Sequence, residues 1–242
     1  MPYQKKDALG ILFLFEHGYV VSQLIFNPEH LLIHSFANEP AVNPEHLSAE
    51  WLRQRFARQR IWTPESTDEH VLAHNLDFRP ASVLIPIVIR DHGLTILLTQ
   101  RAANLNHHAG QISFPGGRVE KLDRNPVETA LREAEEEVGL ERQHVSILGT
   151  LPDYKTGTGY QVTPVVSLVQ PPFDLKADPG EVASIFEVPL AFLMDGKHHQ
   201  RRAYALPDGS GERIFYAMPY QKHFIWGATA GMLRNLFHMI RA

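Results

Sequence analysis

Residues 132–140 read REAEEEVGL, and this stretch decides the fold because it combines a helical pattern with a dense run of carboxylates. The helix that contains it is predicted to run from Pro126 to Val138. Asn125 supplies a side-chain acceptor for the first turn, and proline is favoured at the first helical position. Gly139 then supplies the left-handed residue that commonly ends a helix.

Three of the glutamates share one face of this predicted helix. At about 100° per residue, Glu133, Glu136 and Glu137 fall within one arc, whereas the apolar residues fall within another. Like charges three and four residues apart cost about 0.2–0.5 kcal/mol per pair unless cations lie among them. Oxygen ligands on one face suit hard ions such as Mg²⁺ or Mn²⁺, although a solvated acidic helix is the ordinary alternative.

A glycine-rich turn precedes the helix at residues 114–117, which read FPGG. Gly116 and Gly117 allow the backbone to turn tightly and bring bare carbonyls or amides close to a ligand. A turn of this kind also occurs in ordinary loops. The order of a glycine pair, an acidic loop, a capped helix and paired glutamates is what favours a metal site over a plain surface helix.

Composition excludes several classes of protein. The 242 residues include 44% hydrophobic residues, which is enough for a sizeable core, and the net charge of −4 argues against a nucleic-acid partner. With no cysteine, disulfides, thiolate zinc sites and cysteine nucleophiles are excluded. No apolar run approaches the roughly 18 residues of a membrane span, and the short run at residues 8–15 only weakly imitates a signal peptide. We therefore expect a cytoplasmic location and no membrane partner.

The chain divides into an N-terminal extension, residues 1–47, and a main domain, residues 48–242, with its core at about residues 81–240. Apolar runs at residues 11–15, 19–26 and 31–36 predict a small β-rich extension. Ser48 is a predicted helix cap. The runs SVLIPIVI and LTILLTQ flank the turn RDHG and predict a hairpin, and residues 225–240 have helical spacing. These elements predict an α/β (α+β) fold with a mixed sheet covered by helices.

The helix and the turn before it resemble the Nudix box, written G-x5-E-x7-R-E-U-x-E-E-x-G-U with U aliphatic. REAEEEVGL fills the second half completely, with Ala134 and Leu140 at the U positions. The first half departs from the pattern. Counting from Gly117, the acidic residue is Asp123 instead of Glu, and eight residues separate it from Arg132. The resemblance implies a Nudix-type α/β/α sandwich with a mixed sheet and a loop-helix-loop box.

A second stretch of sequence restricts the resemblance to one group of Nudix enzymes. Residues 97–117, LLTQRAANLNHHAGQISFPGG, are similar to the LLT-x-R and H-x-G-Q-x-x-FPGG signature of Nudix enzymes that cleave coenzyme A. Later segments are also similar, so the resemblance covers about residues 48–240. It implies a coenzyme A pyrophosphatase that needs Mg²⁺ or Mn²⁺. Hydrolysis of ADP-ribose, NADH or another nucleoside diphosphate derivative is the alternative, and a non-catalytic binding module is a third possibility. By family habit, the chain is expected to form a homodimer.

The resemblance also assigns roles in metal binding and catalysis. It implies that Glu133, Glu136 and Glu137 bind the metal, with a backbone carbonyl of Gly117 or its neighbour completing the site. Glu133, Arg132 and Glu181 are the expected catalytic group. Within that group, the expected role of Arg132 is a salt bridge that holds the carboxylates in place. Glu181 is either a general base or a further metal ligand, with an ordinary surface glutamate as the equal alternative.

Four residues are expected to bind the nucleotide substrate. Arg101, His108 and Gln111 match the coenzyme A signature, and Lys155 lies in the loop sequence YKTGTGY, where a cation can meet a phosphate. The alternative for His108 is a structural histidine that is hydrogen-bonded within the loop. Phe224 and Trp226 are expected in the core of the closing helix, since they belong to an apolar pattern.

Overall fold

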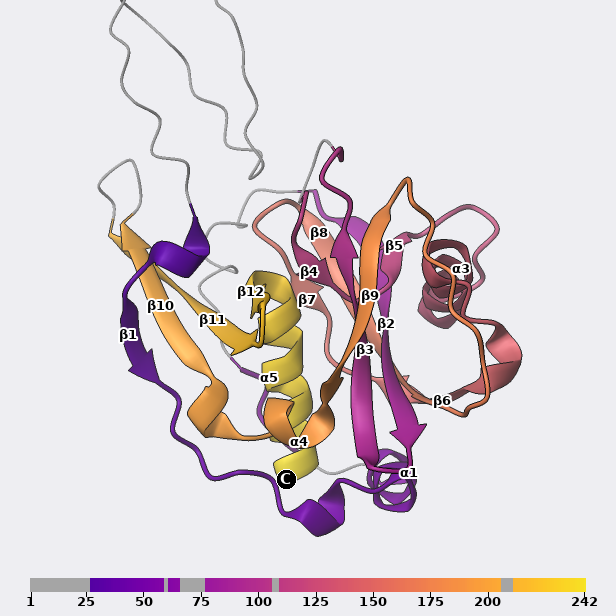
Figure 1. Cartoon of the computed structure of the whole chain (residues 1–242), viewed down its shortest axis with the longest axis horizontal. Coiled ribbons are helices and arrows are strands. Elements are labelled where there is room, and N and C mark those ends of the chain that lie inside the picture. The colour runs from indigo at the N-terminus through magenta and orange to yellow at the C-terminus, as the bar shows by residue number, and fades with distance from the viewer. Residues whose placement is uncertain (1–26, 59–60, 66–76, 106–108, 206–210) are drawn as a thin grey trace, which may run out of the picture.

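The computed structural model describes residues 27–58, 61–65, 77–105, 109–205 and 211–242, and the predicted hairpin forms the centre of its larger sheet (Figure 1). The strands of this sheet are β2 (Arg79–Arg90), β3 (Gly93–Arg101), β4 (Ile112–Ser113), β5 (Gly116–Arg118), β6 (Val145–Thr150), β7 (Tyr154–Lys155), β8 (Tyr160–Val169) and β9 (Val182–Pro189). The order is β4-β3-β2-β8-β6, while β5 pairs with β2, β7 with β8 and β9 with β3. Because β2 and β8 are parallel and the other pairs are antiparallel, the sheet is mixed, as predicted.

Strands β2 and β3 separate at the end of the hairpin that is farthest from their turn, and this separation positions the site. β2 and β3 pair from Ile87 to Arg90 and from Gly93 to Ile96. Beyond this zone β3 pairs with β4, and β2 pairs with β5. The turn between β4 and β5 is held in the opening because the amide of Leu84 donates to the carbonyl of Pro115 at 2.9 Å. The glycine pair is therefore fixed to the centre of the sheet.

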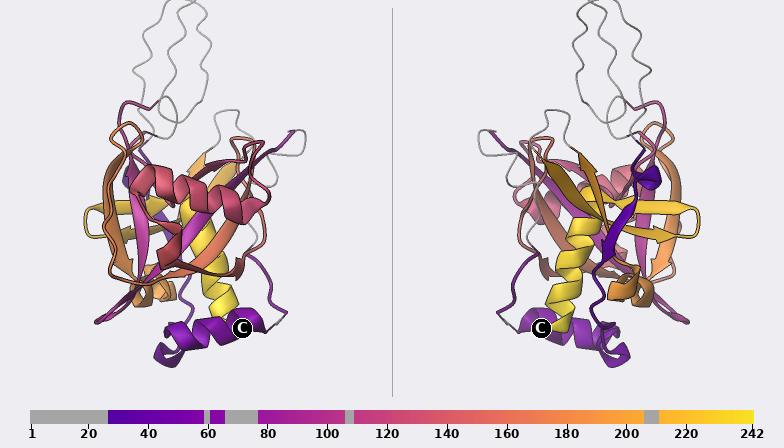
Figure 2. Two further views of the ribbon diagram at one scale, coloured as in Figure 1. Left: turned by 90° about the vertical axis from the view of Figure 1, so that its right-hand side faces the viewer. Right: turned by 90° about the vertical axis from the view of Figure 1, so that its left-hand side faces the viewer.

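Helices cover both faces of the larger sheet (Figure 2). α3 (Pro126–Val138) packs Ala130, Ala134 and Val138 against one face, and α5 (Gly227–Arg241) packs against the other. Burying a Val or Leu side chain contributes about 1.5–3 kcal/mol, so the apolar stripe of α3 fixes which side of this helix turns away from the sheet. The predicted closing helix is confirmed. Phe224 and Trp226 precede it, however, because the chain is still extended at these positions.

A second sheet, which the sequence pattern did not predict as a separate unit, lies on the other side of α5. Its order is β1 (Ile33–Phe36), β10 (Gln200–Ala205), β11 (Glu212–Tyr220) and β12 (His223–Trp226), all antiparallel. β1 joins the end of the predicted extension to a strand more than 160 residues away. The first two predicted strands and the signal-like run lie outside the described residues. The domain boundary at residue 47 stays a prediction.

Two short α-helices and four 3-10 helices, at Pro28–His30, Pro44–His46, Arg142–His144 and Gly196–His198, also belong to the described structure. α1 (Ala49–Ala57) begins after Ser48, whose hydroxyl accepts a hydrogen bond from the amide of Trp51, so the predicted cap is confirmed. α4 (Leu190–Leu193) follows β9 directly. Among the described residues, no helix has the length and apolar character needed to cross a membrane.

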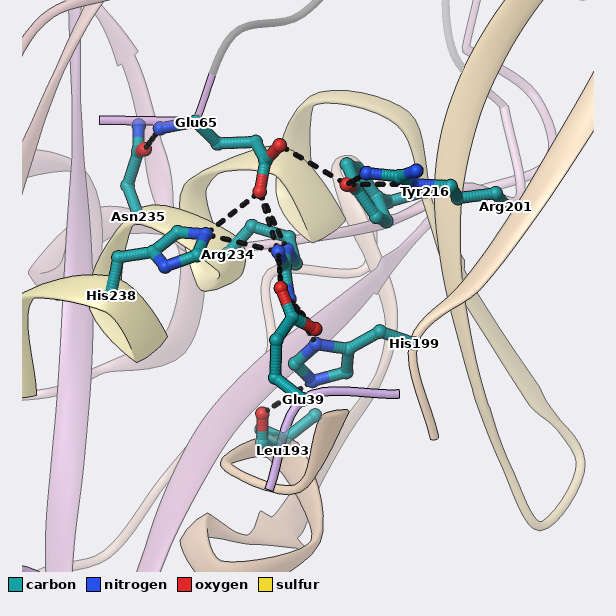
Figure 3. Close-up of polar contacts among 9 residues, drawn as sticks. All are labelled: Glu39, Glu65, Leu193, His199, Arg201, Tyr216, Arg234, Asn235 and His238. Carbon is teal, nitrogen blue, oxygen red and sulfur yellow. Dashed lines mark hydrogen bonds and ion pairs between the residues drawn. The ribbon is translucent and has the colours of Figure 1, made fainter. Parts of the chain in front are cut away.

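A buried ionic network fastens α5 to two distant segments (Figure 3). The side chain of Arg234 is only 1% exposed. It forms a two-point ion pair with Glu39, at 2.6 and 3.0 Å, and donates two hydrogen bonds to one carboxylate oxygen of Glu65, at 2.6 and 2.9 Å. Glu65 is also bonded to Tyr216 and His238. One guanidinium thus connects residues that lie 195 and 169 positions away in the chain.

His199 belongs to the same network in its neutral form. Its Nε2 lies 2.9 Å from the carbonyl oxygen of Leu193, which can only accept, so Nε2 carries the proton. Nδ1 then accepts from Arg234 at 3.0 Å. Burial lowers the pKa of His199 to about 4, and the positive charge of Arg234 acts in the same direction. A protonated His199 would place a second cation against Arg234.

The protein is expected to lose stability as the pH falls from about 6.5 to about 4. In this range the unfolded chain binds a proton at His199 that the folded chain does not, so the free energy of unfolding falls by up to about 1.4 kcal/mol per pH unit from this group. Urea unfolding of the wild type and of His199→Gln at several pH values measures the effect. The variant should show a slope smaller by about one proton. Equal slopes would show that His199 titrates alike in both states.

Candidate active site

α3 is the helix predicted from the sequence, with the same ends and the same caps. The side chain of Asn125 accepts from the amide of Glu128 at 3.0 Å, and Pro126 occupies the first turn. Gly139 adopts a φ of +70° and returns its amide to the last turn of the helix. These local signals place the glutamates on the side of the helix that meets the glycine turn.

Glu133 packs directly against Gly117. A Cβ atom built on Gly117 would lie 2.3 Å from Oε1 of Glu133, which is closer than real Cβ atoms approach. Burial raises the pKa of Glu133, although Arg132 favours its charged form. The missing side chain of Gly117 therefore forms the space in which this carboxylate lies.

Gly117→Ala is expected to reduce turnover at least about tenfold with little change in stability. The methyl group meets only the flexible end of Glu133, which can swing away, so the carboxylate is displaced while the backbone stays in place. Gly116→Ala is the matched comparison, because its Cβ would meet the backbone at the carbonyl of Ser82 and at Val83. We expect it to cost about 1–3 kcal/mol of stability. Rates and thermal unfolding of both variants separate the two effects.

Glu137 is the most buried carboxylate of the helix, with a side chain 4% exposed. It accepts a hydrogen bond from the amide of Gly116 at 3.2 Å, and Nη1 of Arg101 lies 3.7 Å from its other oxygen. Burial nevertheless raises its pKa to about 8, and the charges of Glu133 and Glu181 contribute in the same direction. The partners present do not offset the desolvation of this group, so a nearby cation would stabilise its charged form.

Arg132 holds the outer part of the carboxylate group together, as expected from the sequence. It donates to Glu133 at 3.0 Å and to Glu136 at 2.9 Å. It also donates to both oxygens of Asp123, at 3.1 and 3.0 Å, and to the carbonyl of Arg118. Asp123, the residue at the altered position of the box, is therefore the anchor of this arginine. The hydrogen bond from Arg132 holds the pKa of Asp123 well below its usual range.

Glu136 and Glu181 lie at the edge of the group. The side chain of Glu136 is 59% exposed, and its contact is with Arg132. Glu181 is exposed, but its carbonyl accepts from the amide of Ala102, which ties it to the end of β3. Its charge raises the pKa of both Glu133 and Glu137, so the fold brings this late glutamate close to the helix. Their roles as metal ligand or base stay predictions.

The donor set fits a hard divalent cation. Two desolvated carboxylates, Glu133 and Glu137, face a turn without side chains at Gly116 and Gly117, and oxygen donors of this kind suit Mg²⁺ or Mn²⁺. Within the described residues, no group of three or more His, Cys, Asp or Glu is arranged as a finished metal site. Among the described residues, Arg132 lies 3.0 Å from Glu133 and Arg101 lies 3.7 Å from Glu137.

Arg101 borders the carboxylates and has spare hydrogen-bonding capacity. Among the described residues, its buried Nε has no hydrogen-bond partner. Its amide donates to the carbonyl of Gln111 at 2.9 Å, which joins two parts of the stretch at residues 97–117. An unsatisfied guanidinium nitrogen beside a buried carboxylate is a suitable donor for a phosphate oxygen.

Gln111 lines a pocket of about 290 Å³ on the face of the sheet opposite α3. Phe224 and Trp226 also line it, together with Gln100, His223 and Lys222. The expectation that both aromatic residues belong to the core of the closing helix is therefore wrong, because β12 carries them to the wall of the pocket. His108 lies outside the described residues. Lys155 lies 5.1 Å from the centre of the ring of Phe78.

Comparison with known proteins agrees with this geometry. The family model described as NUDIX domain matches residues 78–209. The Escherichia coli K12 protein named uncharacterized Nudix hydrolase NudL is 44% identical over 162 residues, which cover 66% of this chain and 82% of that protein. Two solved structures are also similar. A C. elegans Ap4A hydrolase binary complex has a TM-score of 0.41 and 17% identity, covering 46% of this chain and 80% of that one.

The second structure is the NUDIX domain of Shewanella oneidensis NrtR complexed with ADP ribose. It has a TM-score of 0.38 and 19% identity, and it covers 52% of this chain and 85% of that one. The predicted Nudix fold class is confirmed by the match to the family model. Nudix hydrolases act on nucleoside diphosphate derivatives and generally require divalent metals such as Mg²⁺ or Mn²⁺. The matched residues, the relative and the carboxylate helix with its glycine turn lead to one conclusion: the chain belongs to the Nudix hydrolase family.

Proposed function

We propose that this protein hydrolyses coenzyme A or its acyl thioesters, adding water across the diphosphate to give 3′,5′-ADP and 4′-phosphopantetheine. The observation that carries the proposal is the position of Arg101. This residue of the coenzyme A signature lies beside Glu137, pairs through its backbone with Gln111 and has an unpartnered Nε. The signature therefore borders the carboxylates, where a diphosphate would have to lie.

In this proposal, different residues of the chain bind the metal and position the carboxylates. Glu133 and Glu137 would hold the metal, with Glu136 and the carbonyl of Gly117 as further ligands. When bound, Mg²⁺ or Mn²⁺ supplies positive charge against the diphosphate oxygens and acidifies a water molecule. Arg132 positions Glu133 and Glu136 through the hydrogen bonds described above.

Two other residues act toward the substrate and the water. Arg101 would donate to a non-bridging phosphate oxygen and orient the diphosphate for in-line attack. Glu181, exposed at the edge of the carboxylate group, would accept the proton of the attacking water. The pocket lined by Gln111 would receive the amide-bearing pantetheine arm, since amide and aromatic side chains both face it. His108 is retained as a further substrate contact.

A substrate panel tests the proposal. Purified protein is given coenzyme A, ADP-ribose, NADH and deoxynucleoside triphosphates with Mn²⁺ or Mg²⁺, and the products are separated chromatographically. We expect 3′,5′-ADP from coenzyme A, no product in EDTA and recovery when the metal is returned. Cleavage of another diphosphate with coenzyme A left intact would overturn the substrate and keep the enzyme class. Ligand binding without any hydrolysis would indicate a binding module. We also propose a cytoplasmic homodimer, which gel filtration and fractionation of cells would test.

A further inference from the structure

Two arginines gather around Tyr160 at the rim of the larger sheet. The guanidinium of Arg79 lies 4.4 Å from the centre of the Tyr160 ring. Nε of Arg118 donates to the Tyr160 hydroxyl at 2.9 Å, and its guanidinium lies 5.5 Å from the ring centre. The three residues come from β2, β5 and β8, which are neighbours in the sheet. We call them the arginine corner.

The charge and exposure of the arginine corner suit it to binding an anion. Among the described residues, no carboxylate lies within ion-pair distance of Arg79 or Arg118, whereas Arg90, Arg132, Arg142 and Arg234 all have carboxylate partners. An aromatic ring carries no net charge, so contact with Tyr160 leaves the positive charge of both guanidiniums in place, and Arg118 uses its Nε–H on the Tyr160 hydroxyl. Both arginines are exposed. Tyr160 therefore orders two cations without neutralising them.

The corner lies at the same rim of the sheet as the carboxylate group but on the opposite face, because Arg118 pairs with Ala81 and Tyr160 packs against the apolar cluster on the α5 side, whereas α3 covers the other side. Arg118 follows Gly117, which packs against Glu133, and its carbonyl accepts from Arg132 at 3.1 Å. Gly117 pairs with Ser82, and Arg79 lies three residues from Ser82 along β2, a distance of about 10 Å at the usual rise of a strand. A nucleotide whose diphosphate lies at the carboxylates would reach the corner by passing the rim of the sheet at Gly116 and Gly117, which carry no side chains.

Lys155 does not belong to this corner. It pairs with Gln161, the residue next to Tyr160 on β8, and side chains of successive strand residues point to opposite faces of a sheet. A third cation approaches instead from the second sheet, because the guanidinium of Arg213 lies beside Gly157 in the loop before Tyr160.

We propose that the arginine corner binds a phosphate monoester of the substrate, namely the 3′-phosphate that distinguishes coenzyme A from its dephospho form. The inference rests on the proposed function and deepens it, since it makes Arg79 and Arg118 the residues that select the phosphorylated nucleotide. ADP-ribose and NADH lack this group.

The test compares coenzyme A with dephospho-coenzyme A as substrates of the full-length enzyme with Mn²⁺. The ratio of the two kcat/KM values is about tenfold or more in the wild type and falls to about twofold or less in Arg79→Gln. Arg79→Lys, which keeps the charge, recovers most of the preference. Arg53→Gln on α1 is the matched control and keeps the wild-type ratio. Binding of 3′,5′-ADP and 5′-AMP, measured by calorimetry in EDTA, should show the same difference without turnover.

The outcomes separate the two proposals. If neither form of coenzyme A is hydrolysed, the proposed function fails and this inference fails with it. If both forms are hydrolysed equally by the wild type, or if Arg79→Gln keeps the preference, the inference alone is overturned. Loss of the preference in Lys155→Gln but not in Arg79→Gln would also overturn it, since the 3′-phosphate would then lie on the other face of the sheet.

Discussion

Glu137→Gln is expected to lower kcat at least about 100-fold while leaving the protein folded. A carboxylate that would hold a divalent cation is replaced by an amide of nearly the same shape, so the cation loses one negative charge of its site. The side-chain carbonyl of glutamine can still accept from the amide of Gly116. Because burial raises the pKa of Glu137 to about 8, removing its charge should not reduce stability.

Three measurements check this prediction: product formation from coenzyme A, Mn²⁺ binding by calorimetry and thermal unfolding. Glu135→Gln is the matched control, because Glu135 is on the same helix, is half exposed and pairs with Arg142. We expect the control to keep nearly full activity. A Glu137→Gln protein that retains most of its turnover would show that this carboxylate does not bind the metal. Unchanged ligand binding in a wild type without turnover would favour the binding-module alternative.

Arg234→Met is expected to destabilise the protein by about 3–5 kcal/mol. The change removes the guanidinium that lowers the pKa of Glu39 and that, together with the hydrogen bond from His238, lowers the pKa of Glu65, and a buried carboxylate that loses its cation is costly. Because total stabilities of single domains are about 5–15 kcal/mol, this is a large share. Urea unfolding at pH 7 measures the loss.

The comparison variant for this prediction is Arg142→Met. Arg142 pairs with Glu128 at 2.9 Å, but both side chains are more than a third exposed, and such surface pairs contribute about 0–1 kcal/mol. Similar losses in the two variants would show that the buried network adds little. Replacing Arg234, Glu39 and Glu65 together by apolar residues should recover part of the loss, since no charge is then left unpaired.

The elements predicted correctly are those whose defining residues, such as helix caps, turns and apolar stripes, lie close together in the sequence. α3 was predicted from Asn125 to Gly139 because its caps and its apolar stripe all lie within fifteen residues. The hairpin was predicted because a turn separates two apolar runs. The second sheet was not predicted, since β1 and β10 have no shared pattern and meet only in the folded chain. Arg202 illustrates this: it donates to carbonyls of Pro28, Glu29 and Leu31.

The same distinction holds within the site. Glu133, Glu137 and Arg132 could be selected because their spacing on one helix is a local property. The anchoring role of Asp123 depends on the path of the loop, and the loop is one residue longer than the box pattern allows. The arginine corner depends on parallel pairing of β2 and β8, so no short stretch of sequence contains it. The pocket walls at Phe224 and Trp226 depended on where the last strand ends.

The parallel pairing of β2 and β8 has a consequence for the order in which the molecule forms. Arg79 and Tyr160 are 81 residues apart, and the intervening chain contains the hairpin partner strand, the glycine turn and α3. Closing so long a loop is slow, whereas a capped helix forms within about a microsecond. We therefore expect α3 to exist with its glutamates in water before the sheet assembles. The free-energy cost of removing the Glu137 carboxylate from water is then incurred when the sheet assembles onto α3. Neutralising this carboxylate should therefore speed the assembly of the sheet.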